Sequence, residues 1–394
     1  MRNKLVRIYY KLTDKKKSYK FTSIKKFCET IGYKYDMLSE TVECEELRPR
    51  IWNIRKNSLI ISRELPETYI AEIRNGIVFG ENEIIVSNGI VLSDIFANFY
   101  AKKMVLKKGV VKKIDLESQE VQLYYHNYRN MPIDKAINLV GIFPYSYYHF
   151  LVNILPKLYY FSKREEYKDY PLLIDTRAYD NFKEIIDLFN VDKRKIICVK
   201  PHTACMVKNL IVSSNCAWYD RYVREEFLSE TGFVYDKEAM QFIRKHAISM
   251  CKKREENRRV FISRKKMPEE RRRIVEEDRL EKMFEKYGFI SVCPEELTFL
   301  EQVQLFSETK ILAGATGAAF TNVIFLPSDA TIIYFTPTSD NKTENLFSTL
   351  WNSVGEGRTI VVEGKVTEET KGMKDNLRKF EIDFEETEKM LNSL

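Results

Sequence analysis

Residues 314–322, Gly-Ala-Thr-Gly-Ala-Ala-Phe-Thr-Asn, are the segment whose residue types point most directly to chemistry. They follow a short apolar run that we expect to be a strand. Small residues after a strand let the backbone turn sharply, and the N–H groups at the next helix start can face an anion. Gly314 begins this turn, and Gly317, Ala318 and Ala319 place no bulk between those amides and a phosphate. A turn that needs small residues only for packing is the alternative, because glycine-rich turns are common.

Ser263 and Arg264 follow a second apolar run, residues 260–262, and we expect them at the carboxyl edge of the same sheet. Ligands of α/β proteins bind at that edge. The planar guanidinium of arginine donates two parallel hydrogen bonds, which suits a pyrophosphate. A solvated charge within a basic run is the alternative interpretation of Arg264.

Glu277 lies in the first turn of the helix expected after this strand. A carboxylate at that place accepts hydrogen bonds from a ribose in dinucleotide-binding folds. Acidic residues also favour the positive end of a helix dipole, so a purely structural role is the alternative.

His149 is the candidate general base, and it stands within Tyr-Tyr-His-Phe-Leu-Val-Asn at residues 147–153. We expect it at a helix start, just after a strand and beside an interdomain cleft. An imidazole there can take up a proton at neutral pH. A histidine packed in the core is the alternative. Two other histidines of the predicted first domain (residues 1–235), His126 and His202, lack this placement.

No metal site is expected, because the chain contains no Asp-x-Asp sequence. Cationic side chains and helix amides would then neutralise a diphosphate. The seven cysteines show no C-x-x-C spacing and the four histidines lie far apart, which favours reduced thiols in a cytoplasmic protein without a zinc site.

Two stretches of alternating strands and helices are expected to position these residues. The first has strands at 138–143, 171–175, 195–199 and 209–214, with helices near 148–161 and 180–189. The second has strands at 260–262, 289–292, 310–313 and 331–335, a helix ended by Gly288, and a Thr298–Glu301 capping box. Such alternation predicts mostly parallel sheets covered by helices. Residues 1–65 show only short helical patterns among many charges.

We therefore predict three parts. Residues 1–235 form one Rossmann-like domain with an irregular α+β N-terminal extension, residues 236–368 a second Rossmann-like domain, and residues 369–394 a helical tail.

Composition narrows the class of protein. The 394 residues carry a net charge of +7 and 44% hydrophobic side chains, which suits packed domains. The charged N-terminus predicts no signal peptide, and the prolines, histidine and tyrosines of residues 138–161 disfavour a membrane span. Nucleic-acid binding would depend on charge runs alone, without any known module, so no nucleic-acid partner is expected.

Taken together, these segments resemble glycosyltransferase family 61, which includes proteins of capsular polysaccharide biosynthesis. The resemblance covers roughly residues 65–340 and depends on the order and spacing of its segments: Val260–Arg264, Arg273–Leu280, Gly288-Phe, Gln302–Phe306, Gly314–Phe325, Tyr148–Leu158 and, more weakly, Leu65–Tyr69 through Asp94.

The resemblance implies two Rossmann-like domains facing a cleft (a GT-B fold) and an inverting, metal-independent transfer of a hexosyl or pentosyl group. A nucleotide sugar would be the donor and would bind to the domain of residues 236–368. A glycan or lipid-linked molecule would be the acceptor, and the domain of residues 1–235 would lie on the acceptor side. Arg264, Glu277 and the loop from Gly317 to Asn322 match donor-binding positions, and His149 matches a first-domain histidine. The protein would be cytoplasmic, with a peripheral contact to the inner face of the plasma membrane.

Three positions depart from the family pattern. Thr316 replaces a usual histidine, Glu276 a usual asparagine, and Asn153 a frequent carboxylate. A non-catalytic relative that binds a sugar nucleotide or a glycan is therefore the alternative function.

Overall fold

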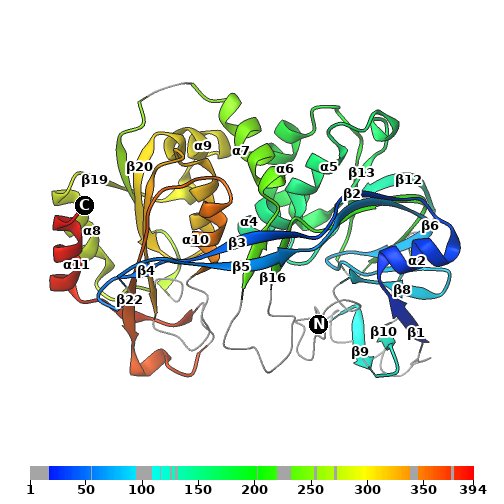
Figure 1. The fold of residues 1–394 in the computed structure, drawn as a ribbon, viewed down its shortest axis with the longest axis horizontal. Coiled ribbons are helices and arrows are strands. Elements are labelled where there is room, and N and C mark those ends of the chain that lie inside the picture. The colour runs from blue at the N-terminus through cyan, green and yellow to red at the C-terminus, as the bar shows by residue number, and fades with distance from the viewer. Residues whose placement is uncertain are drawn as a thin grey trace. The chain divides into compact units, whose positions relative to one another are not determined.

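The computed structural model describes residues 17–54, 56–94, 109–115, 117–124, 127–128, 132–201, 203–219, 232–252, 255–269, 273–337, 345–373 and 377–394. Contacts divide the chain into two compact units (Figure 1). The N-terminal unit consists mainly of Met1–Val42 and Pro66–Asn215. The C-terminal unit consists of Glu43–Leu65, Cys216–Asp220 and Ser229–Leu394. Both mix helices with sheets, so the predicted α/β class is confirmed.

The N-terminal unit is built on one large sheet. Its strands are β1 (Lys17–Thr22), β2 (Tyr35–Ser39), β6 (Thr68–Phe79), β7 (Ile85–Ser87), β8 (Ile90–Leu92), β9 (Val111–Asp115), β10 (Glu120–Leu123), β11 (Asn127–Tyr128), β12 (Ile133–Asn138), β13 (Leu172–Asp175), β14 (Ile196–Val199) and β15 (Thr203–Ser213). Its helical elements are α2 (Ile24–Ile31), α4 (Tyr147–His149), η1 (Phe150–Ile154), η2 (Leu155–Lys157), α5 (Leu158–Phe161), η3 (Glu165–Tyr167) and α6 (Thr176–Phe189).

The strand order of this sheet reverses beside β12. From β12 the chain passes to β13 and then to β14 on one side, and β15 returns to pair with the other side of β12. All of these pairs are parallel, whereas β6 runs antiparallel to β15. The ends of β12 and β15 are thus a topological switch point, the place where open α/β sheets bind ligands.

Two predicted elements of this unit differ from the structure. The strand expected at 138–143 lies earlier in the chain, as β12, and ends at Asn138. The apolar Leu139 and Val140 were expected in this strand, but they are buried in the loop that follows it. The single helix expected near 148–161 is divided into α-, π- and 3₁₀-helical pieces. Pro156 lacks the N–H that a continuous α-helix would use, which accounts for the 3₁₀ piece.

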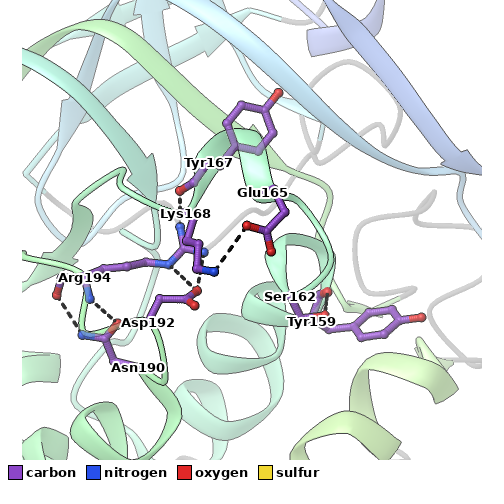
Figure 2. A network of polar contacts seen from close by, with 8 residues as sticks. All are labelled: Tyr159, Ser162, Glu165, Tyr167, Lys168, Asn190, Asp192 and Arg194. Atoms are coloured by element: carbon purple, nitrogen blue, oxygen red, sulfur yellow. Dashed lines mark hydrogen bonds and ion pairs between the residues drawn. The ribbon is translucent and has the colours of Figure 1, made fainter.

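At the opposite edge of the sheet, before β13 and β14, the polar groups satisfy one another (Figure 2). Arg194 is 8% exposed, and its guanidinium donates to Asp192 at 2.8 Å and to the carbonyl of Tyr167. Asn190 accepts from the Arg194 backbone N–H at 2.9 Å and donates to its carbonyl at 2.8 Å. This network fixes the loops before β13 and β14 and thereby supports the fold.

The C-terminal unit has a second, smaller parallel sheet. This sheet consists of β4 (Arg50–Ile51), β18 (Arg258–Ile262), β19 (Phe289–Val292), β20 (Thr309–Ala315), β21 (Thr331–Pro337), β22 (Thr359–Val366) and β23 (Phe380–Glu381), of which β23 runs antiparallel to β22. The unit also contains two separate two-stranded sheets, β3 (Val42–Arg48) with β5 (Leu59–Leu65) and β16 (Ala217–Tyr219) with β17 (Phe233–Tyr235). Its helical elements are α7 (Lys237–Ser249), α8 (Glu277–Lys286), η7 (Pro294–Glu296), α9 (Phe299–Ser307), η8 (Ala318–Phe325), α10 (Asn345–Asn352), η9 (Glu368–Thr370) and α11 (Phe384–Asn392).

This sheet also reverses its strand order. Its strands are ordered β19-β18-β20-β21-β22-β23, so the chain moves from β18 to β19 on one side and returns with β20 on the other. The switch point therefore lies between the ends of β18 and β20. Large buried side chains fix the strands and helices around it, among them Phe261, Phe284, Phe335 and Phe380.

One strand of this sheet comes from far upstream in the sequence. β4 pairs in parallel with β22, with Arg50 opposite Ile360 and Ile51 opposite Val361 (Figure 1). The neighbouring Glu46 is fully buried. Arg63 donates to its Oε2 at 2.5 Å, and the side-chain amide of Asn345 donates to its Oε1. Residues 43–65, whose elements could not be predicted, thus complete the C-terminal unit.

Candidate functional site

The ends of β18 and β20 bring the predicted phosphate-binding segments together. Ile262 is paired with Gly314 across the two strands, so Ser263 and Arg264 follow at the same edge as residues 315–317. Gly314 has φ of +151°, and a Cβ on it would lie 2.9 Å from the carbonyl oxygen of Ile262. Glycine is required here because a side chain would be strained and would also clash with the neighbouring strand.

Two arginines converge on the loop after β20. Arg264 Nη1 donates to the Thr316 carbonyl at 3.1 Å. Arg273 Nη1 donates to the same oxygen at 3.1 Å and to Thr316 Oγ1 at 2.9 Å. A Cβ on Gly317 would come within 3.1 Å of Arg264 Nη1, so the small residue lets the guanidinium approach the loop. Two cations beside exposed backbone form a setting that favours a diphosphate.

Arg273 was missed as a site residue in the sequence. It follows a run of basic residues, which is typical of a solvated surface. In the structure it is only 8% exposed, and its guanidinium lies 5.7 Å from the ring centre of Phe380. Its presence in one of the segments shared with the resembling family was the only available signal.

Ser263 and Glu277 position Arg264 through hydrogen bonds to the backbone and to a buried side chain. Glu277 is 8% exposed, and its Oε1 accepts from the backbone N–H of Arg264 at 3.1 Å. Ser263 is 1% exposed and its hydroxyl donates to Glu281. Both residues therefore hold the strand end in place. Contact of Glu277 with a ribose stays a prediction.

The loop after Thr316 leads into η8, a 3₁₀ helix rather than an α-helix. Ala318 at its start is exposed and Ala319 is half-buried, and the first N–H groups of any helix have no partner within it. Asn322 is fully buried, and its amide donates to Gln302 at 3.0 Å and to the Ala319 carbonyl at 3.1 Å. Asn322 thus fixes the loop, while the backbone of Ala318 and Ala319 can face a ligand.

His149 ends α4 in the N-terminal unit, directly before the π-helical turn η1. Its Nδ1 lies 3.1 Å from Asn153 Oδ1, and the ring of Phe143 stacks against it at 5.0 Å. If the amide oxygen accepts from Nδ1–H, the lone pair is on Nε2, as a base requires. Burial lowers the pKa of His149 from its ordinary value of 6.5, so the neutral form prevails at pH 7. His126 and His202 lie outside the described residues.

The described residues contain no group of three or more His, Cys, Asp or Glu side chains placed to hold a metal ion. None of the helices in the described part of the chain has the length and hydrophobicity to cross a bilayer.

Comparison with known families gives one match, which spans residues 147–333 and belongs to the model described as glycosyltransferase 61. Residues 147–333 are thereby assigned to glycosyltransferase family 61. The comparison with curated proteins gave no match.

The family 61 match begins at α4 and ends in β21, so it includes His149 as well as Arg264, Arg273 and the loop after β20. The match to this family implies a glycosyltransferase. The roles of individual residues follow from their geometry and are proposed below.

Proposed function

We propose that this glycosyltransferase transfers a hexosyl or pentosyl group from a nucleotide sugar to a glycan or lipid-linked acceptor in capsular polysaccharide synthesis. The observation that carries the donor assignment is the convergence of Arg264 and Arg273 on Thr316 at the β18–β20 switch point. The guanidinium groups and the amides of Ala318 and Ala319 would bind the diphosphate. They carry the counter-charge, so the reaction is proposed to need no metal ion.

The proposed chemistry is a single displacement with inversion in a GT-B arrangement. The acceptor oxygen forms a bond to the anomeric carbon while the bond to the diphosphate breaks. His149 Nε2 takes the acceptor proton, and the nucleoside diphosphate leaves with its charge held by the arginines. The lowered pKa of His149 supports this role, because the ring is neutral before the reaction.

The location follows from the same proposal. Nucleotide sugars and lipid-linked acceptors meet at the inner face of the plasma membrane, so we propose a cytoplasmic protein that contacts this surface peripherally. The net charge of +7 favours an anionic leaflet.

A non-catalytic relative that binds a sugar nucleotide or glycan is the second candidate. It is favoured by Thr316, which stands where the resembling family usually has histidine, and by Asn153, which supports His149 without a negative charge. A carboxylate at that position would stabilise the imidazolium formed during transfer.

Thermal unfolding with a panel of nucleotide sugars, without added metal, tests the proposal. A donor at about 100 times its Kd stabilises the folded state by about 2.7 kcal/mol, which is several degrees in Tm. The matching nucleoside monophosphates serve as the control. Absence of any shift across the panel contradicts the donor site. Transfer of the stabilising sugar to water or acceptor separates the enzyme from the non-catalytic relative.

A further inference from the structure

A small polar pocket lies at the other switch point, within the N-terminal unit. It has a volume of about 40 Å³, and its walls include Asn138 at the end of β12 and Ser213 at the end of β15. Glu83, Asp94 and Lys157 also face it. A volume of this size holds about three water-sized groups, which is enough for one edge of a ligand but not for a whole sugar ring.

Two charged groups of this pocket, Glu83 and Lys157, make no hydrogen bond or close ion pair within the part of the chain that the structure describes. Lys157 is only 7% exposed, yet its ammonium makes no hydrogen bond or ion pair with any residue that the structure describes. The carboxylate of Glu83 is likewise without a hydrogen bond among the described residues. Asp94 differs, because it accepts from the Ile24 N–H at 3.0 Å and from the hydroxyl of Tyr69. Glu83 and Lys157 are therefore the groups with bonding capacity left for a ligand.

Other polar atoms in the walls share this property. Ser213 Oγ is buried without a hydrogen-bond partner among the described residues. Asn138 Oδ1 accepts from the Val140 N–H at 3.1 Å, and the NH₂ of the same side chain remains as a donor. Burial raises the pKa of Glu83, although the positive charge of Lys157 opposes this effect. Such a set of unsatisfied groups costs stability unless a ligand or water completes it.

The negative and positive charges in the pocket determine which kind of ligand can bind there. The carboxylates of Glu83 and Asp94 repel a phosphate, and the ammonium of Lys157 repels an amine. A neutral hydroxyl suits both groups, since it can donate to Glu83 and accept from Lys157. We propose that this pocket binds a hydroxyl or hydroxymethyl group of a saccharide and, on the basis of the function proposed above, positions the acceptor sugar.

Saturation-transfer NMR on the full chain without nucleotide tests this proposal. The probes are the methyl glycosides of glucose, galactose, mannose and N-acetylglucosamine at millimolar concentrations, with inorganic phosphate as a competing class. At least one glycoside is expected to bind. Glu83→Gln keeps the size of the side chain and removes its charge, so affinity should fall about 10–100-fold, the effect of one charged hydrogen bond. Lys157→Met should weaken binding to a similar degree.

Glu72→Gln is the matched control, because Glu72 is a partly buried carboxylate of the same unit that already pairs with Tyr167 and Lys34 outside the pocket. It should leave glycoside binding unchanged. In transfer assays, Glu83→Gln should raise the KM of the acceptor more than it lowers kcat, whereas a general loss of folding would lower the donor affinity as well.

Three results would overturn the proposal: no glycoside binds, phosphate binds instead, or Glu83→Gln binds as well as the parent. If glycosides fail to bind while nucleotide sugars still raise Tm, only the acceptor pocket is refuted. If glycosides bind and no nucleotide sugar does, the pocket stands and the donor proposal fails.

Discussion

Polar residues lie at equivalent points of the sheets of the two units, but the charges of these residues differ: they are mixed in the N-terminal unit and positive in the C-terminal unit. Each sheet reverses its strand order once within its parallel part, between β12 and β15 or between β18 and β20. The N-terminal switch point carries Glu83 and Lys157 around a pocket. The C-terminal one carries Arg264 and Arg273 around a loop of small residues. Topology therefore decides where a site forms, and the residues that end the strands decide what it binds.

The two sites also differ in how their charges are held. Thr316 accepts from both arginines, so the C-terminal site is organised before a ligand arrives. Glu83 and Lys157 of the N-terminal pocket make no hydrogen bond with any described residue, so a ligand or water is needed to complete their bonding. A pre-organised cationic site suits a multiply charged donor, whereas the incomplete pocket suits a neutral acceptor whose hydroxyl group supplies the missing bonds.

His149→Ala has the largest expected effect and tests whether the N-terminal unit supplies the base. Transfer should slow about 10²–10⁴-fold, the usual range for a lost general base, while donor affinity is unchanged. Single-turnover rates and calorimetry measure the two quantities. His246→Ala is the control, because His246 stacks on Phe242 in α7 of the other unit. A rate within a few-fold of the parent would make His149 a core histidine, and Asp94 would become the better candidate.

Arg264→Ala should weaken nucleoside-diphosphate binding by about 1.5–3 kcal/mol, the contribution of a charged hydrogen bond. Titration calorimetry measures this loss. Arg279→Ala provides the control, since Arg279 lies in the same unit but contacts Phe384 and Glu276. Glu83→Gln should not change the affinity. Equal affinities of parent and Arg264→Ala would remove the donor from the C-terminal switch point.

Gly317→Ala should reduce diphosphate affinity by about 0.5–1.5 kcal/mol, the value of one ordinary hydrogen bond, because its Cβ pushes against Arg264 Nη1. Its φ of 170° suits any residue, so Tm should not change. Gly314→Ala is the opposite case and should lower stability by about 1–3 kcal/mol through backbone strain. Calorimetry and thermal unfolding of both variants distinguish a binding role from a folding role, and a Tm loss in Gly317→Ala would contradict the assignment.

Glu83→Gln should have a smaller effect, on stability, that depends on pH. The folded protein holds the proton of Glu83 above its ordinary pKa of 4.5, so the parent loses stability as pH rises through the raised value. The amide cannot ionise and escapes this loss. At pH 7 the free energy of unfolding of the variant should therefore exceed that of the parent by about 0.5–2 kcal/mol, and its Tm should be higher. Both differences should vanish near pH 4. Lys157 and Asp94 face Glu83, and their charges act on its ionised form in the parent only: Lys157 opposes the rise of the pKa and Asp94 adds to it, while burial is the largest cause and sets the direction. A constant difference across this range would show that Glu83 does not titrate as proposed.

Chelation should have no effect on the rate. If Arg264 and Arg273 carry the counter-charge, turnover in EDTA should equal turnover without it. Loss of activity that Mn²⁺ or Mg²⁺ restores would refute the metal-free mechanism and would leave the arginines with only part of the diphosphate charge.

The C-terminal sheet could be predicted closely because its signals are local. The expected strands at 260–262, 289–292, 310–313 and 331–335 correspond to β18 to β21. The Thr298–Glu301 capping box is present, and Gly288 has φ of +80°. The placement of Arg264 beside the loop followed from one rule, that parallel strands end at one edge.

The remaining features depend on residues far apart in sequence. Arg273 is buried only because Thr316 and Phe380 come to it, and Lys157 becomes a pocket residue only beside Glu83. β12 was misplaced because Asp134 and Lys135 interrupt its apolar pattern. Such contacts leave no periodic trace in the sequence.

The pairing of β4 with β22 has a consequence for biosynthesis. Arg50 is synthesised well before its partner Ile360. At about 5–20 residues per second, the roughly 300 residues between them take about 15–60 s to be synthesised. During this interval β4 lacks β22, and the buried Glu46 lacks Asn345, although Arg63 is already present. The C-terminal unit can therefore close only after β22 has been synthesised, and a truncated chain that begins at residue 236 would leave an edge of its sheet uncovered.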